Sequence, residues 1–315
     1  MTGPGPLGGR TRSGTNARGL SVRPEILQRV RSLEVRTRGL VESLFSGDHP
    51  SVFHGRGFEF SFVRPYQPGD DIRSIDWRVT ARRNSPYVRQ FVEERDLLVV
   101  LIVDVSASGR LGAGEHSAGE VAAEVAAAIA FAAARQNDRF SLVLVSDEVE
   151  HILPAGTGRK HAIRLLADLL EHQPRSPRTD LTPALSWIRR SLHRRATLFL
   201  VSDFIHPTES RAFQGALNRA ARHHDLVGVR IGSPASDRLP DVGWVELTDP
   251  ESGARTVVNT GDRRIRERFQ AEVRESRAEM ADLLTRAGAD LVDVSTATDP
   301  LLALGGFFHR RRGRR

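Results

Sequence analysis

Cysteine is absent from the 315 residues of this sequence. Disulfide bonds, thiolate nucleophiles and cysteine-ligated zinc sites are therefore excluded, and a reducing compartment is compatible with the composition. No apolar run approaches the ~18 residues that a membrane-spanning helix needs. Residues 1–19 also lack the apolar core of a secretory signal. We therefore expect a cytoplasmic protein.

The net charge of +7 is concentrated at the two ends of the chain. Four arginines lie in the segment 1–23, which has no acidic residue, and five of the six residues 310–315 are arginine. Because these arginines outnumber the net charge, the body between them is close to neutral. We predict that residues 1–22 and 310–315 are basic tails. Such tails can bind nucleic acid or acidic lipid, but a disordered, solvated end is the favoured interpretation.

The first structured region is predicted over residues 23–95. Apolar residues at helical spacing after Pro24 predict an amphipathic helix that ends near Gly47. Residues 51–94 then change to short apolar pairs, glycine, proline and dense charge. Within them, the segments FEFSFV and PYVRQFV predict two short strands. We expect a small β-containing segment that precedes the main domain.

Residues 96–309 alternate between predicted strands and predicted helices, which is typical of a mostly parallel, doubly wound α/β sheet. The strands are predicted at 97–103, 139–145, 196–202, 225–231 and 289–294. The helices are predicted at 116–135, 160–171, 181–193, 209–223 and 262–287. The segment GWVELTDPESGARTVV interrupts this alternation and predicts a hairpin about DPESG at one edge of the sheet.

Carboxylates and hydroxyls follow the predicted strands, at the sheet edge where α/β folds bind ligands. The candidate oxygen donors are Asp104, Ser106 and Ser108 after the first of these strands, Ser202 and Asp203 after a later one, and Thr179, Asp180 and Thr182 in the loop before the helix at 181–193. Oxygen donors without histidine or cysteine suit Mg²⁺ or Mn²⁺, and two aspartates with three hydroxyls leave a coordination position for water or for a partner's carboxylate. The alternative is structural, because Asp, Ser and Thr also favour turns and helix N-caps.

Among these donors, the run Asp104, Ser106 and Ser108, followed by Thr179 and then Asp203, resembles the metal-ion-dependent adhesion site of von Willebrand factor type A domains. The resemblance implies that Asp104, Ser106, Ser108, Thr179 and Asp203 ligate Mg²⁺ directly or through water. It also implies a Rossmann-type sheet as the fold.

The segment GRGFEFSFVRPYQPGDDIRSIDWRVTAR resembles the bacterial domain-of-unknown-function family 58. The residues that carry the resemblance are Gly55, Gly57, Glu59, Arg64, Tyr66, Gly69, Asp70, Asp71, Arg73, Ile75, Asp76, Trp77, Ala81 and Arg82. The resemblance extends from about residue 51 to the DPLLALGGFFHRR ending. One departure is Gly109, where the family pattern leads us to expect methionine.

Two interpretations of the charged motif from Arg64 to Arg82 stay open. The motif binds a partner directly, or its three aspartates pair with its arginines and hold the segment on the sheet. The expected pairs join Asp70, Asp71 and Asp76 to Arg64, Arg73 and Arg82. Exposed pairs contribute only ~0.2–1 kcal/mol each, so they would serve specificity more than stability.

The sequence lacks the motifs of three enzyme classes that are built on α/β sheets. Haloacid dehalogenase-like phosphatases need a second aspartate where Ser106 stands, and neither a Gly-x-Ser-x-Gly elbow nor a phosphate-binding loop is present. We predict that the protein is not an enzyme and has no small-molecule substrate.

The family resemblance implies an interaction module that accompanies a MoxR-type AAA+ ATPase and helps to assemble or mature other proteins. We expect no nucleic-acid partner, and membrane contact only through the basic tails. The alternative is a nucleic-acid or acidic-surface binder that acts through those arginine-rich tails.

Overall fold

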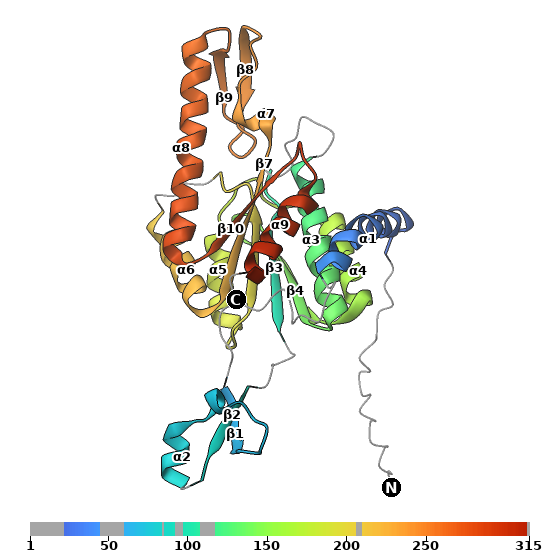
Figure 1. Cartoon of the computed structure of the whole chain (residues 1–315). Helices are drawn as coiled ribbons and strands as arrows, with labels where there is room; N and C mark the ends of the chain where they lie inside the picture. The colour runs from blue at the N-terminus through green and yellow to red at the C-terminus, as the bar shows by residue number, and fades with distance from the viewer. Residues whose placement is uncertain are drawn as a thin grey trace, which may run out of the picture.

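The centre of the computed structural model is a six-stranded sheet with the strand order β10-β7-β6-β3-β4-β5 (Figure 1). The residues that the structure describes are 22–44, 60–83, 85–91, 97–107, 117–205 and 210–313. The strands are β3 (Leu98–Asp104), β4 (Arg139–Val145), β5 (Val149–Gly156), β6 (Thr197–Ser202), β7 (Asp225–Gly232) and β10 (Asp290–Ser295). All neighbours are parallel except β4 and β5, which confirms the predicted mostly parallel sheet.

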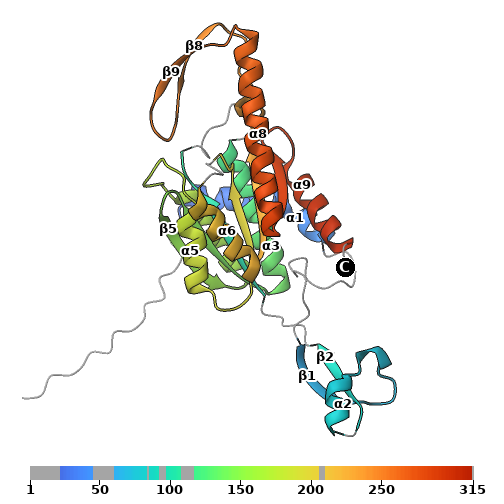
Figure 2. The same ribbon diagram turned by 90° about the vertical axis from the view of Figure 1, so that its left-hand side faces the viewer.

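Helices cover both faces of the sheet, as a doubly wound fold requires. The helices on one face are α1 (Pro24–Leu44), α3 (Ala118–Gln136), α4 (Gly158–Glu171) and α9 (Pro300–Gly313). The helices on the other face are α5 (Thr182–Ser191), α6 (Arg211–His223) and α8 (Arg263–Ala287). Figure 2 shows α5, α6 and α8 on the side of the sheet that faces the viewer.

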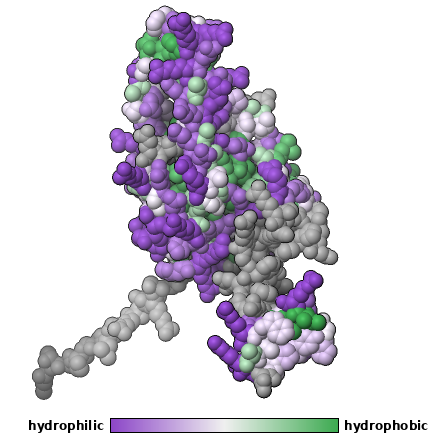
Figure 3. Space-filling view, turned by 60° about the vertical axis from the view of Figure 1, so that its left-hand side comes forward, coloured by the Kyte–Doolittle hydropathy of each residue, from purple (hydrophilic) through white to green (hydrophobic). Residues whose placement is uncertain are grey.

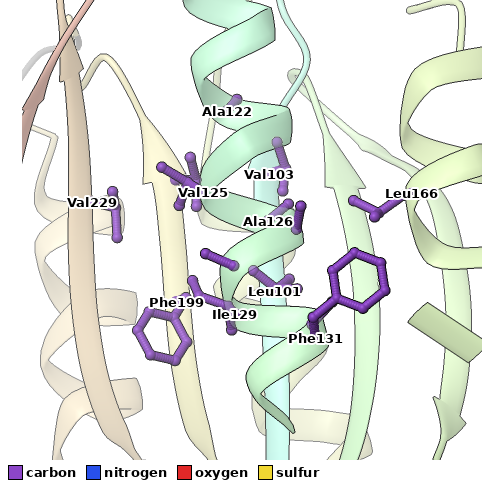
Figure 4. Packing of buried hydrophobic residues seen from close by; sticks show 14 of the residues in the cluster. Leu101, Val103, Ala122, Val125, Ala126, Ile129, Phe131, Leu166, Phe199 and Val229 are labelled. Carbon is purple, nitrogen blue, oxygen red and sulfur yellow. The ribbon is translucent and has the colours of Figure 1, made fainter. Parts of the chain in front are cut away.

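Strand β3 is buried on both faces, which explains its continuous apolar sequence. Leu101 and Val103 pack with Val125 and Ile129 of the alanine-rich helix α3 (Figure 4). Val100 and Ile102, which alternate with them on β3, point to the opposite face and belong to the second core cluster, under α5 and α6. The small side chains of α3 let this helix lie close to the sheet, so the strand that carries Asp104 is held from both sides.

Helix α1 belongs to the sheet unit, which differs from the predicted domain of residues 23–95. Ile26 and Val30 are buried in the same cluster as α3, α4 and α9. Arg36 also forms an ion pair of 2.8 Å with Glu124 of α3, whose side chain is almost fully buried. The amphipathic pattern of this helix is therefore matched to the helix layer and not to the β segment that follows it.

The β segment forms a separate two-stranded antiparallel sheet, in agreement with the two predicted strands. It consists of β1 (Phe60–Pro65) and β2 (Tyr87–Phe91), joined by the short helices η1 (Ile72–Ser74) and α2 (Trp77–Arg83). A single bridge from Ile75 to Val88 ties the connection to β2. Figure 1 shows this unit apart from the six-stranded sheet.

Strand β5 and helix α9 are the longest elements that were not predicted from the sequence. Strand β5 contains Pro154, which a strand tolerates at a sheet edge because the missing N–H faces away from the ladder. Helix α9 contains Gly305 and Gly306, which lower helix propensity, yet Phe308 on the same helix is buried in the core. The helix continues to Gly313, so residues 310–313 are helical, and within them the Arg311 side chain is only 13% exposed.

The predicted hairpin is present but does not join the edge of the main sheet. Strands β8 (Trp244–Thr248) and β9 (Arg255–Asn259) pair only with each other, after the short helix α7 (Pro234–Asp237). Hydrophobic side chains gather at the same end of the molecule in Figure 3, and Trp244 is 72% exposed. The hairpin is thus an insertion between β7 and α8.

No helix in the described part of the chain combines the length and the apolar character needed to cross a bilayer.

Candidate metal centre

Strands β3 and β6 are neighbours at the point where the strand order of the sheet reverses. The chain leaves β3 for β4 on one side, and it leaves β6 for β7 on the other side. In open α/β sheets, the crevice beyond the carboxyl ends of two such strands is the usual ligand site. Asp104 ends β3 and Asp203 directly follows β6, so both predicted carboxylates lie at this point.

The partly buried carboxyl group of Asp104 is held by the two loops. Its Oδ1 accepts a hydrogen bond from the Ser106 N–H at 3.0 Å, and its Oδ2 accepts one from the Ser202 hydroxyl at 2.7 Å. Burial, together with the charge of Asp203, raises the pKa of Asp104 from 3.8 to about 6, against the effect of these hydrogen bonds. The two carboxylates therefore repel each other, which a nearby cation relieves.

The loop after β6 holds Asp203 in a constrained backbone. Asp203 Oδ1 accepts the Ile205 N–H at 3.0 Å, and Ser202 Oγ accepts the Phe204 N–H at 3.0 Å. Between them, Phe204 is buried and has a φ of 53°, which is rare for a bulky side chain and costs roughly 1–3 kcal/mol. Such strain persists only where the surroundings fix the backbone, so the direction of Asp203 is set by the fold.

The loop that carries Thr179 lies beside the loop after β3. The Ala107 N–H donates to the Pro177 carbonyl at 3.0 Å, and the Asp180 N–H donates to the Ser146 carbonyl at 2.9 Å. These bonds tie the loop to the ends of β3 and β4. The Asp180 carboxylate accepts the backbone N–H of Thr182 at 2.8 Å, so it supports the start of α5.

A carboxylate that the sequence did not indicate reaches Thr179 from the hairpin turn. Glu251 accepts the Thr179 hydroxyl at 2.7 Å and the Thr179 N–H at 3.2 Å. The two residues are 72 positions apart, and no sequence pattern links them. The only available signal was the acidic turn DPESG, because hairpin tips are where exposed functional side chains gather.

The predicted donors that the structure describes are all of the oxygen type that a hard cation takes. Asp104 and Asp203 lie at the ends of adjacent strands, Ser106 is fully buried in the loop after β3, and Thr179 lies in the loop beside it. Ser108 lies outside the described residues. Within the described part of the chain, no three His, Cys, Asp or Glu side chains form a metal-binding group. An ion here would rest on two carboxylates with hydroxyls and water, which Mg²⁺ accepts because it keeps several waters.

The charged motif of the small β unit is built around one ion pair. Arg64 binds both oxygens of Asp70, at 2.7 and 2.6 Å, and Asp70 also accepts the Gln67 N–H at 2.8 Å. Gly69 has a φ of +110°, a conformation that favours glycine in this turn. The Tyr66 N–H donates to a backbone carbonyl before β2, so the turn is fixed on both sides.

The other aspartates of the motif bind the backbone. Asp71 accepts the Arg73 N–H at 2.9 Å, and buried Asp76 accepts N–H groups in the first turn of α2. Of the three expected pairs, the contacts show the Arg64–Asp70 ion pair. The carboxylates of Asp71 and Asp76 instead accept backbone N–H groups at the starts of η1 and α2. Trp77 and Arg82 on α2 are exposed, and Trp77 is 67% accessible to solvent. A direct binding role for this face stays a prediction.

The raised pKa of Asp104 gives a pH-dependent stability. Because the folded form holds this proton more tightly than the unfolded chain does, stability falls as the pH rises from 3.8 through about 6. We expect Asp104→Asn to stabilise the metal-free protein at neutral pH by up to ~3 kcal/mol, which raises its Tm. Near pH 3.8, the usual pKa of the carboxyl group, the substitution should have little effect on stability. Thermal unfolding in EDTA across this pH range measures it. An equal effect at all pH values would contradict it.

The described residues thus form a doubly wound, mostly parallel α/β sheet with two aspartates at its strand switch point. The chain itself belongs to the family described as "Protein of unknown function DUF58", which matches residues 62–279. Uncharacterized protein Rv1480 of Mycobacterium tuberculosis is 33% identical over 293 residues, which cover 92% of this chain and 91% of that protein.

Two solved structures are similar at the level of the fold. An aerotolerance-related membrane protein from Bacteroides fragilis has a TM-score of 0.48 and 13% identity, covering 70% of this chain and 100% of that one. A von Willebrand factor type A structure from Catenulispora acidiphila has a TM-score of 0.41 and 10% identity, covering 71% and 43%. The fold assignment rests on the strand order and helix layers of this chain.

Proposed function

We propose that this protein is a non-catalytic, metal-dependent protein-interaction module that binds Mg²⁺ (or Mn²⁺) through Asp104, Ser106, Ser108, Thr179 and Asp203. Its proposed partner is a MoxR-type AAA+ ATPase, and its proposed role is the assembly or maturation of other proteins. We propose a cytoplasmic location, with which the cysteine-free composition is compatible.

The observation that carries this proposal is the pair of carboxylates at the switch point of the sheet. Asp104 and Asp203 stand on adjacent strands, and Asp104 has its pKa raised by burial and by the second charge. Alone, they repel an acidic side chain of a partner. A bound divalent cation supplies a positive charge and an open coordination position at that place.

The arrangement around Asp104 favours binding over catalysis. Its two oxygens accept hydrogen bonds from the Ser106 N–H and the Ser202 hydroxyl, so both are held in place by the loops around them. The MoxR-type partner is supported by membership of the DUF58 family and by the resemblance of its motifs.

A copurification experiment tests the function. A MoxR-type ATPase from the same cell is expected to remain on the immobilised chain in Mg²⁺ and to be lost in EDTA, because its acidic contact needs the cation. Asp104→Ala should lose the ATPase in both conditions. Equal recovery in Mg²⁺ and EDTA would show that the interaction does not depend on metal.

The alternative, binding through the basic tails, has one observation against it. Arg311 forms ion pairs with Asp225 and Asp290, so its charge is neutralised inside the fold. Residues 1–21 lie outside the described residues. Removing residues 1–22 is expected to leave the copurification unchanged, whereas a tail-driven interaction would be lost.

A further inference from the structure

The β8–β9 hairpin projects from the sheet unit and its turn comes back toward the carboxyl edge of the sheet (Figures 1 and 2). It precedes α8, a helix of 25 residues whose buried side chains are Met280, Leu283 and Leu284, all near its C-terminal end. The first half of α8 therefore extends beyond the sheet. The hairpin precedes the N-terminal end of α8, and its turn contacts the loop that carries Thr179.

The contact at the end of the hairpin is a two-point grip on a carboxylate. Thr179 donates both its hydroxyl and its backbone N–H, one to each oxygen of Glu251, at 2.7 and 3.2 Å. Thr179 is only 5% exposed, so its hydroxyl and N–H are fixed in position by the surrounding loop. Hydrogen bonds to an ionised acceptor are roughly twice as strong as neutral ones.

The turn itself presents Glu251 in a fixed position. The Asp249 carboxylate accepts the Glu251 N–H at 3.0 Å and also binds the Ser252 hydroxyl. Gly253 has a φ of +71°, and its N–H donates to the Asp249 carbonyl at 2.8 Å. An ordered turn loses little conformational entropy when its glutamate binds, so this contact is preorganised.

The seat on Thr179 is compatible with the metal ligation proposed above. A threonine hydroxyl has one proton and two lone pairs. When the proton is donated to Glu251, the lone pairs of the hydroxyl oxygen remain available to a cation.

Core packing does not explain why the hairpin is docked. Its strands add nothing to the six-stranded sheet, and Trp244 and Val257 on it are 72% and 64% exposed. The polar contact with Thr179 is therefore the feature that relates the turn to the site.

We propose that the backbone and hydroxyl of Thr179 form a carboxylate-binding seat that the chain fills with its own Glu251. An acidic segment of the protein partner binds there by replacing Glu251, so the hairpin competes with the partner. The identity of that partner rests on the proposed function, but the seat itself needs no metal and is tested without one.

The mobility of the turn between β8 and β9 tests whether Glu251 is bound to Thr179. The chain has no cysteine, so a single Ala254→Cys substitution at an exposed turn position accepts one nitroxide label. In EDTA, Glu251→Ala and Thr179→Val are expected to narrow the electron paramagnetic resonance lines by freeing the turn. The control is Glu246→Ala, which removes a carboxylate of the same hairpin that pairs with Arg255 at 3.2 Å. Unchanged lines in both test variants would overturn the seat.

Binding of a peptide tests whether the seat accepts an external carboxylate. The probe is a fluorescein-labelled peptide with the sequence of residues 247–256, and its partner peptide has glutamine in place of Glu251. The tethered turn has an effective concentration of about a millimolar, so it competes strongly in the wild type. We expect the acidic peptide to bind the Glu251→Ala chain at least about tenfold more tightly than the wild type. Equal binding to both chains, or equal binding of the glutamine peptide, would overturn the proposal.

Mn²⁺ binding separates the failure of this inference from failure of the proposed function. If the wild type binds Mn²⁺ but the turn is equally mobile in all variants, the seat is wrong and the metal site stands. If the turn is released by Glu251→Ala but the chain binds no Mn²⁺, the seat stands and the metal-dependent function is wrong.

Discussion

Asp104→Ala is expected to weaken Mn²⁺ binding by about 100-fold or more, and Asp203→Ala is expected to do the same. Each substitution removes one of the two carboxylates that would neutralise the ion, and the remaining hydroxyls cannot hold a divalent cation that dehydrates reluctantly. The two residues are far apart in the sequence but stand on adjacent strands. Titration calorimetry and water-proton relaxation of Mn²⁺ measure the loss.

Asp180→Ala is the matched control for these variants. Asp180 is the next carboxylate along the same edge, and it accepts the Thr182 N–H at the start of α5. Its loss is expected to cost about 1 kcal/mol of stability and to leave Mn²⁺ binding intact. If the folded Asp104 and Asp203 variants bind Mn²⁺ as tightly as Asp180→Ala does, the metal site is refuted.

Arg311→Ala is expected to have the largest effect on stability among changes at the chain ends, about 3 kcal/mol at neutral pH. The Arg311 side chain is 13% exposed, binds Asp225, and lies 3.6 Å from Asp290. Burial raises the pKa of Asp225, and Arg311 opposes that shift. Without Arg311, a buried carboxylate is left without its cation.

The loss should shrink as the pH falls toward the raised pKa of Asp225, because protonation removes the unpaired charge. Denaturant unfolding at several pH values measures it. Arg310→Ala, at the exposed neighbouring position of α9, should change stability by less than about 0.5 kcal/mol. Equal effects of the two substitutions would show that Arg311 acts only as a surface charge.

The sheet and the two aspartates could be predicted because their signals are local. The apolar run before Asp104 is dense enough to require burial on both faces, and Asp203 follows a similar run. Parallel strands bring their carboxyl ends to one edge, so residues after the strands meet without any knowledge of the tertiary contacts. The same reasoning placed Thr179 near them, in the loop before α5.

The parts that could not be predicted depend on contacts between distant segments. Glycines at 305 and 306 argue against a helix, but burial of Phe307 and Phe308 against the core outweighs that propensity. Arg311 looks like part of a solvated run until Asp225 is placed beside it. Glu251 looks like an ordinary turn residue, because no sequence pattern connects it to Thr179, which is 72 positions away.

The insertion between β7 and α8 has a consequence for how relatives of this protein can diverge. The chain leaves the sheet at Gly232 and returns along α8 to β10, so the hairpin lies in an insertion that adds no strand to the six-stranded sheet. Its length and its tip sequence can change while the strand order and the core stay as they are. If the proposed seat on Thr179 selects the partner, that selectivity can change with this one exposed loop while the six strands stay the same.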